Sequence, residues 1–213
     1  MKVLMLNGSP NEKGCTYTAL CQVGEILNDE GIDYEIFHLE PGPVRDCIGC
    51  MRCNGQGCIF NRDSDASVED FVRKAREADG FVFGTPVYYS HPSGSLLSFL
   101  DRVFFGICDG FTYEPFAHKP AAAVVSARRA GTTSSIDILN KYFSIAQMPV
   151  VGSTYWNMVH GWKPSDVTKD LEGMQTLRNL GRNLSWLLKC FEAGKKNGII
   201  PPEAEKVHMT NFI

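Results

Sequence analysis

The chain has 213 residues and a mass of 23.6 kDa, which is the size of one large domain built around a single core. Its 44% hydrophobic and 21% charged residues are typical of a globular protein and exclude the collagen-like, disordered and coiled-coil classes. A net charge of -3 and a pI of about 6.0 provide no broad cationic surface, so nucleic acid is not an expected partner.

The amino-terminal apolar run, Met1–Asn7, is too short for a signal peptide, and no stretch of about 18 apolar residues occurs in the chain. We therefore expect a cytoplasmic protein without a membrane partner. Eight cysteines are many for such a protein, and four of them lie within one short segment. In a reducing compartment this clustering indicates metal or redox chemistry before structural disulfides.

Short apolar runs alternate with longer amphipathic stretches, a pattern typical of buried parallel strands and covering helices. The predicted strands are residues 2–6, 33–37, 80–84, 121–126 and 150–154. The predicted helices are residues 16–28, 68–77, 95–104, 135–145 and 170–193. Right-handed crossovers between them give an α/β fold: a doubly wound, five-stranded parallel sheet with helices on both faces. For a chain this short, the flavodoxin-like strand order 2-1-3-4-5 fits better than a six-stranded dinucleotide fold.

A single domain, residues 1–213, accommodates all of these elements. Two segments are longer than the scaffold requires: a cysteine-rich insertion at about 39–67, and residues 155–169. Long ordered loops commonly have a function. The end of the chain, about 170–213, is predicted to be a helix followed by a tail that lies over the surface or reaches a partner subunit.

The turn after the first strand, between Asn7 and Thr18, is rich in glycine and hydroxyl side chains and leads directly into a helix. Such a turn directs backbone N–H groups and hydroxyls at one point in front of the positive helix end, which makes a phosphate cradle. Five residues separate Gly8 from Gly14 and no Lys-Ser/Thr pair follows, so this is neither a Walker loop nor a Gly-x-Gly-x-x-Gly turn. The alternative is an ordinary turn with Thr16 as the helix N-cap.

Two further loops follow the third and fourth strands and meet the first loop at the same edge of the sheet. They contain residues 84–89 and 126–133. In a sheet of order 2-1-3-4-5 a crevice opens where strands 1 and 3 diverge, so the first loop would hold a phosphate and the second would face a flat ring. Backbone amides near Val87 could bond the ring edge, and Tyr88 could stack on it. Alternatively, Tyr88 and Tyr89 only close the end of the core.

These motifs resemble a known group of proteins. Gly8-Ser9-Pro10 with Gly14-x-Thr16, followed by Gly84-Thr85-Pro86-Val87-Tyr88, is similar to the NAD(P)H-dependent FMN reductase and iron–sulfur flavoprotein group of the flavodoxin-like superfamily. The resemblance covers residues 1 to about 154. It implies an FMN-binding domain, NAD(P)H as reductant and a homodimer or tetramer.

The resemblance also implies which residues contact FMN. The phosphate would be bound by Ser9, Asn11, Thr16 and Thr18. The isoalloxazine ring would be bound by Pro86, Val87, Tyr88 and Tyr89, and approached from its other side by Ser126, Arg128 and Gly131.

FMN is favoured over FAD because there is one compact phosphate loop and no second nucleotide fingerprint. No side chain is assigned a catalytic role, since hydride reaches flavin N5 and electrons leave without a protein nucleophile or base. Arg128 and Arg129 are candidates to stabilise negative charge on the reduced ring or to bind a nicotinamide phosphate. Paired exposed arginines are also ordinary solvated charges. No motif distinguishes NADH from NADPH.

The clustered cysteines are Cys47, Cys50, Cys53 and Cys58. Three thiolates at every third position followed by a glycine-rich return can enclose one [4Fe–4S] cluster, as in ferredoxin-type loops. Zinc fits less well, because all-cysteine zinc sites usually combine two Cys-x-x-Cys pairs across a longer spacer. The four residues are therefore candidate cluster ligands, with free thiols or a switchable disulfide as alternatives.

Residues 155–164 contain three large aromatic side chains and a methionine. They form either a satellite hydrophobic cluster or a cover in which Trp156, His160 or Trp162 lies over a flavin of the same or a neighbouring subunit.

The sequence thus predicts an FMN-dependent oxidoreductase that passes hydride or electrons from NAD(P)H to a quinone, free flavin, nitroaromatic or similar small-molecule acceptor. A second hypothesis is an electron carrier with FMN, a [4Fe–4S] cluster and a redox protein partner. A third is a redox sensor in which Cys47–Cys58 change state.

Overall fold

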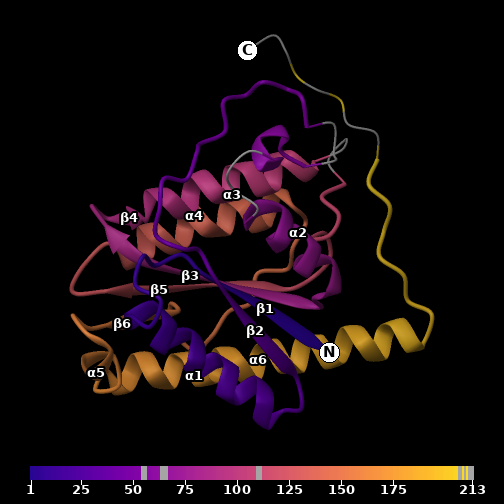
Figure 1. Ribbon diagram of the computed structural model, residues 1–213. Coiled ribbons are helices and arrows are strands. Elements are labelled where there is room, and N and C mark those ends of the chain that lie inside the picture. The colour runs from indigo at the N-terminus through magenta and orange to yellow at the C-terminus, as the bar shows by residue number, and fades with distance from the viewer. Residues whose placement is uncertain (54–56, 63–66, 109–111, 206–207, 209, 211–213) are drawn as a thin grey trace.

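The structure is a computed structural model that describes residues 1–53, 57–62, 67–108, 112–205, 208 and 210 (Figure 1). Its strands are β1 (Lys2–Asn7), β2 (Asp33–His38), β3 (Gly80–Tyr88), β4 (His91–Pro92), β5 (Ala121–Ala127) and β6 (Met158–His160). Its helices are α1 (Cys15–Asp29), α2 (Ser67–Glu77), α3 (Gly94–Ile107), α4 (Thr132–Ile145), α5 (Pro164–Val167) and α6 (Leu171–Lys196), with a 3-10 turn, η1 (Ile59–Arg62).

The parallel strands follow the order β2-β1-β3-β5-β6. This is the predicted order 2-1-3-4-5, because β4 is a short strand that pairs antiparallel with the end of β3 and does not enter the series. The predicted fold class is confirmed.

Helices cover both faces of the sheet (Figure 1). α1 and α6 pack on the face that contains Val3 and Met5, whereas α2, α3 and α4 pack on the face that contains Leu4 and Leu6. Side chains of a strand alternate between the two faces, so a strand covered on both sides is apolar at every position. This is why the central strands were visible in the sequence as uninterrupted apolar runs.

The five predicted helices are confirmed as α1, α2, α3, α4 and α6, with ends that move by at most three residues. Gly14, and not Thr16, occupies the N-cap of α1. Among the described residues, no helix is both long and apolar enough to cross a membrane.

The fifth predicted strand, residues 150–154, is wrong. Val150 forms only an isolated bridge with Ala121. The chain then leaves the sheet and returns as β6, where Met158 pairs with Val125.

Contacts with α6 explain this departure. The Asn183 amide donates a hydrogen bond to the Gly152 carbonyl at 2.9 Å, and the Ser153 hydroxyl donates to the Thr176 carbonyl at 2.7 Å. The Val151 N–H still donates to the Ala121 carbonyl of β5 at 2.8 Å, but from Gly152 on these polar groups are satisfied by α6, an arrangement that β-propensity alone does not reveal.

A carboxylate on β2 connects three elements of the fold. Glu35 accepts hydrogen bonds from Lys2 of β1 and Lys74 of α2, each at 2.6 Å, and these bonds hold its pKa below the ordinary value. Because the folded-state pKa is depressed, the stabilisation is present above the unfolded-state pKa and is lost as the pH falls through the folded-state pKa.

We therefore predict that Glu35→Gln lowers the free energy of unfolding at pH 7 by about 1 kcal/mol or less, the usual value of a partly exposed ion pair. The difference from wild type should shrink below about pH 5, as Glu35 becomes protonated. Urea unfolding across this range measures both. Glu77→Gln is the matched control, since Glu77 contacts Arg73 at 3.9 Å on the surface and should have a smaller effect. A difference that persists or grows in acid would contradict this account.

Candidate nucleotide site and cysteine site

Three loops meet at the carboxyl edge of the sheet, after β1, β3 and β5. The Gly8 N–H donates to the Gly84 carbonyl at 2.9 Å, which joins the first loop to β3. The buried hydroxyls of Thr16 and Ser126 share a hydrogen bond of 2.9 Å, which joins the first turn of α1 to β5. The three loops are therefore held at fixed positions relative to one another.

The loop after β1 is shaped by Asn7. Its side-chain oxygen accepts from the Ser9 N–H, and its amide donates to the Glu12 carbonyl at 2.9 Å. The Ser9 hydroxyl in turn accepts from the Asn11 N–H. The loop ends at Gly14, where no side chain caps α1. Since the first N–H groups of a helix have no intrahelical acceptor, this end is suited to an anion.

A cavity of 660 Å³ lies in front of this helix end, within the size range of ligand pockets. The predicted flavin contacts that line it are Ser9, Asn11, Thr16, Pro86, Val87, Tyr88, Ser126 and Arg128. Three predicted contacts are not among its lining residues: Thr18, Tyr89 and Gly131. The structure thus brings most of the predicted set together from three separate loops.

Tyr88 and Tyr89 do not close the core, since their side chains are 43% and 98% exposed. They belong to a hairpin in which β3 and β4 are joined by Tyr89 and Ser90. Both of these residues have positive φ angles, 50° and 64°, as a tight hairpin turn requires. Only Tyr88 lines the cavity; Tyr89 is at the tip of the turn.

Gly131 has a structural place next to this hairpin. It is the N-cap of α4, with a φ of 91°, and a Cβ atom there would lie 2.5 Å from the Ser90 Cα. The Ser134 hydroxyl also donates to the Ser90 carbonyl at 2.6 Å. The start of α4 thus supports the turn that presents Tyr88.

Sequence reasoning did not find all of the cavity. The segment after β6 supplies Gly161, Trp162, Lys163 and Pro164. Of the three residues proposed as a flavin cover, only Trp162 lines it, and its side chain is 78% exposed. In the sequence, only the aromatic composition of residues 155–164 pointed to this segment. Because the fifth strand was predicted at the wrong place, the return of the segment to the sheet as β6 was not foreseen.

The other aromatic side chains of that segment lie elsewhere. Trp156 and His160 line a separate cavity of 50 Å³. Tyr155 and Trp156 contact each other edge to face, with ring centroids 4.6 Å apart, as expected of a satellite aromatic cluster.

The charges around the larger cavity favour an anion. Lys13, Lys163 and Arg128 line it against one carboxylate, Glu12. Cys15 also lines it; burial, and secondarily Asp166, raises the pKa of this thiol, so the neutral form is favoured.

The four clustered cysteines are free thiols, each partly buried. Burial, and secondarily the thiols of Cys58, Cys50 and Cys47, raises the pKa of Cys53. Cys53 is therefore within electrostatic reach of the other three thiols. No three Cys, His, Asp or Glu side chains among the described residues surround a single ion. In a [4Fe–4S] cubane each thiolate binds a different iron, so the four sulfurs lie farther apart than the ligands of a single metal ion.

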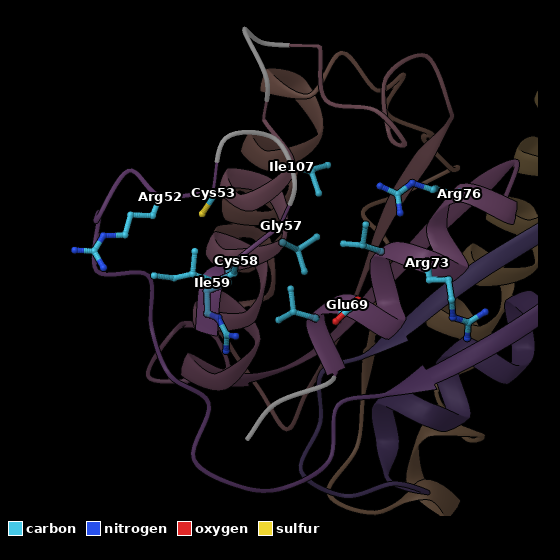
Figure 2. Close-up of a pocket in the computed structure, with 13 residues that line it drawn as sticks. Arg52, Cys53, Gly57, Cys58, Ile59, Glu69, Arg73, Arg76 and Ile107 are labelled. Atoms are coloured by element: carbon cyan, nitrogen blue, oxygen red, sulfur yellow. The ribbon is translucent and has the colours of Figure 1, made fainter. Parts of the chain in front are cut away.

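The cysteine segment borders a second cavity, of 520 Å³, between it and helices α2 and α3 (Figure 2). Cys53 and Cys58 line it together with Arg52, Arg73, Arg76 and Arg102 and one acidic residue, Glu69. Two of these arginines are also paired with carboxylates outside the lining, Arg73 with Asp70 and Glu77, and Arg76 with Glu114. In Figure 2 the loop with Arg52 and Cys53 stands opposite the helix with Arg73 and Arg76. The lining thus has more basic than acidic side chains, which suits an anionic cluster.

A doubly wound sheet of this strand order with a phosphate loop at its carboxyl edge defines a flavodoxin-like nucleotide-binding protein. Residues 1–163 match the family described as NADPH-dependent FMN reductase, and the chain belongs to this family. It is therefore classed as an FMN-dependent oxidoreductase.

Individual relatives agree with this assignment. An iron–sulfur flavoprotein of Methanocaldococcus jannaschii is 31% identical over 198 residues, which cover 90% of this chain and 100% of the relative. FMN reductase (NADPH) of Escherichia coli is 28% identical over 101 residues, 47% of each chain. The crystal structure of RosB with bound 8-demethyl-8-formylriboflavin-5′-phosphate superimposes with a TM-score of 0.67 at 14% identity, covering 100% of this chain and 92% of RosB, and shows the shared fold.

The residues present fit both implied groups. For FMN, the uncapped start of α1 and the cations of the 660 Å³ cavity suit a phosphate, and Tyr88 and Trp162 offer aromatic faces to a ring. For a [4Fe–4S] cluster, the donor set is four thiols, and bound iron reverses the pKa effect seen at Cys53 by deprotonating its ligands.

We predict that Gly131→Ala lowers the free energy of unfolding by more than about 1 kcal/mol, because an L-residue is strained at this φ angle and its Cβ collides with Ser90. Hydrogen exchange should also speed up in the turn at Tyr89 and Ser90. Urea unfolding and peptide-resolved exchange measure the two effects. Gly152→Ala is the control, since a Cβ there meets nothing within 4 Å. Equal effects of the two variants would refute the proposed support of the hairpin.

Proposed function

We propose that this protein oxidises NADPH or NADH through bound FMN and passes the electrons to a small acceptor such as a quinone, free flavin or nitroaromatic compound. The observation that supports this best is a single cavity lined by residues of all three loops, with cations near a free helix end and aromatic side chains nearby.

Each part of the cavity has a distinct task in this proposal. Ser9, Asn11 and the start of α1 bind the phosphate, and Thr16 with Ser126 fixes the loop beneath it. The backbone from Pro86 to Tyr88 contacts the ring edge, in a turn whose geometry is set by α4. Thr18, Tyr89 and Gly131 then act outside direct contact, Thr18 by donating from its hydroxyl to the Gly14 carbonyl.

FMN, when bound, accepts hydride and releases electrons singly or in pairs, so the protein needs no nucleophile or general base of its own. The side chains of the cavity orient FMN and shield it from water. Trp162 covers one side of the cavity and limits water, and Arg128 supplies positive charge at the cavity wall.

The test is steady-state oxidation of NADPH and of NADH by FMN-reconstituted protein, with a quinone and with free FMN as acceptors. Turnover with at least one pair is expected. Failure with every pair, in protein that holds FMN, would overturn the reductase proposal.

Ser9→Ala should raise the dissociation constant for FMN about tenfold or more, since hydrogen bonds to charged groups are worth about 1.5–3 kcal/mol. Thr18→Val is the matched control, because Thr18 does not line the cavity and should change FMN affinity less. Fluorescence quenching of FMN measures both constants. If Thr18→Val weakens binding as much as Ser9→Ala does, the phosphate contacts are assigned incorrectly.

A second candidate function is electron transfer between FMN and a [4Fe–4S] cluster at Cys47, Cys50, Cys53 and Cys58, with a redox protein partner. Four cysteines in one short segment, two of which, Cys53 and Cys58, line a cavity with four arginines, favour it. Slow oxidation of nicotinamides together with fast reduction by a ferredoxin would support this function over the reductase.

For this candidate we predict that Cys53→Ser removes most of the iron and acid-labile sulfide from anaerobically reconstituted protein, because one of four ligands is lost. Cys190→Ser is the control, since Cys190 is exposed on α6 and far along the chain from the others. Its iron content should equal that of wild type. Iron bound equally in both variants would exclude Cys53 as a ligand.

We further propose a cytoplasmic homo-oligomer, a dimer or tetramer. Eight unpaired cysteines suit a reducing compartment. Exposed aromatic side chains, Trp156 and Trp186 among them, provide apolar surface that a second subunit could cover.

A further inference from the structure

A backbone hydrogen bond joins the cysteine segment to α3. The Gly57 N–H donates a hydrogen bond of 2.8 Å to the Gly106 carbonyl. Gly57 and Cys58 also line the cavity that α3 borders with Arg102, Val103 and Ile107. The contact therefore lies directly beside a candidate cluster ligand.

This hydrogen bond completes the end of a helix. Gly106 is the penultimate residue of α3, and the last four carbonyls of a helix have no intrahelical donor. One of these carbonyls is satisfied by the Gly57 N–H. Gly57 has a φ of 100°, a conformation that glycine adopts without strain. The Cys108 N–H donates to the Phe105 carbonyl at 3.4 Å, and the docked loop supplies the donor for the next carbonyl, that of Gly106.

The contact also requires the absence of a side chain at position 106. A Cβ atom on Gly106 would lie 3.1 Å from the Cys58 nitrogen and 3.4 Å from the Gly57 carbonyl carbon. Both are backbone atoms, which cannot rotate away as a flexible side chain can. A Cβ at position 106 therefore requires the Cys58 backbone to shift by a few tenths of an ångström, and a larger side chain such as valine requires more.

Intrinsic helix propensity gives no reason for glycine here. Glycine within a helix is less favourable than alanine by about 1 kcal/mol and is also less favourable than valine. A glycine in the last turn of α3 therefore lowers the stability of the helix, and the close approach of residues 57 and 58 is the compensating feature.

We propose that Gly106 is a positioning residue for the iron–sulfur site. Because it has no side chain, the cysteine loop can pack closely on α3, and this packing sets the position of Cys58 relative to the other three thiols. The functional part of this inference rests on the proposed cluster, whereas the packing of the loop on α3 is present without one.

The experiment compares Gly106→Ala and Gly106→Val with wild type. In protein without iron, exchange of the Gly57 amide should speed up about tenfold or more for Gly106→Val and less for Gly106→Ala, in proportion to the size of the collision. After anaerobic reconstitution, iron and sulfide per chain should fall in the same order. FMN content should stay unchanged, and the thermal midpoint should change little, since the gain in helix propensity opposes the loss of the Gly57 hydrogen bond.

Gly194→Ala in α6 is the matched control, because it makes the same exchange within a helix and its Cβ meets only ordinary contacts at 3.7 Å and beyond. It should alter neither exchange at Gly57 nor iron content. If the Gly57 amide of Gly106→Val exchanges as slowly as that of wild type, the proposed packing role of Gly106 is overturned. Loss of FMN and of thermal stability together with iron would also overturn it, by showing a general structural role.

The two proposals fail in different ways. If wild type binds no iron but exchange at Gly57 is still faster in Gly106→Val, the cluster proposal is wrong and the packing role of Gly106 stands. If wild type binds iron and both Gly106 variants bind it equally, the cluster stands and Gly106 is not a positioning residue.

Discussion

The nucleotide site depends on the hydrogen bond between the hydroxyls of Thr16 and Ser126. It is buried, 2.9 Å long, and connects α1 to β5 across β3. Parallel pairing places the ends of the strands at one edge but does not fix how far apart their loops stand. This bond does so, and Gly84 allows it, since a Cβ there would lie 2.8 Å from the Thr16 methyl group.

The sequence was sufficient for the sheet order and for five helices because both faces of the central strands are buried and every helix has an apolar side. It failed at the fifth strand. There the Gly152 carbonyl accepts from the Asn183 side chain and the Ser153 hydroxyl donates to the Thr176 carbonyl, both in a helix that begins some twenty residues later in the chain. Local pattern holds no information about such distant partners.

The residues that line the site also fall into those that the sequence revealed and those that it did not. Ser9, Thr16 and Tyr88 were predictable because they stand in short motifs directly after strands. Trp162 and Lys163 were placed by the return of β6 to the sheet, which the sequence did not reveal. Gly131 was predicted as a flavin contact, which stays a prediction, and it also packs on Ser90. A positive φ angle and a close backbone approach leave the same glycine signature as a ligand contact.

The cysteine loop lies on the molecule without entering its core. No described residue from Glu40 to Phe60 is fully buried, although strand-to-helix connections in such folds need only about two to six residues. Neither hydrophobic cluster depends on this segment beyond Leu39 and the partly buried Val44. A second redox centre could thus be gained or lost in descent by a single insertion or deletion in the gene, with the flavin-binding scaffold inherited intact.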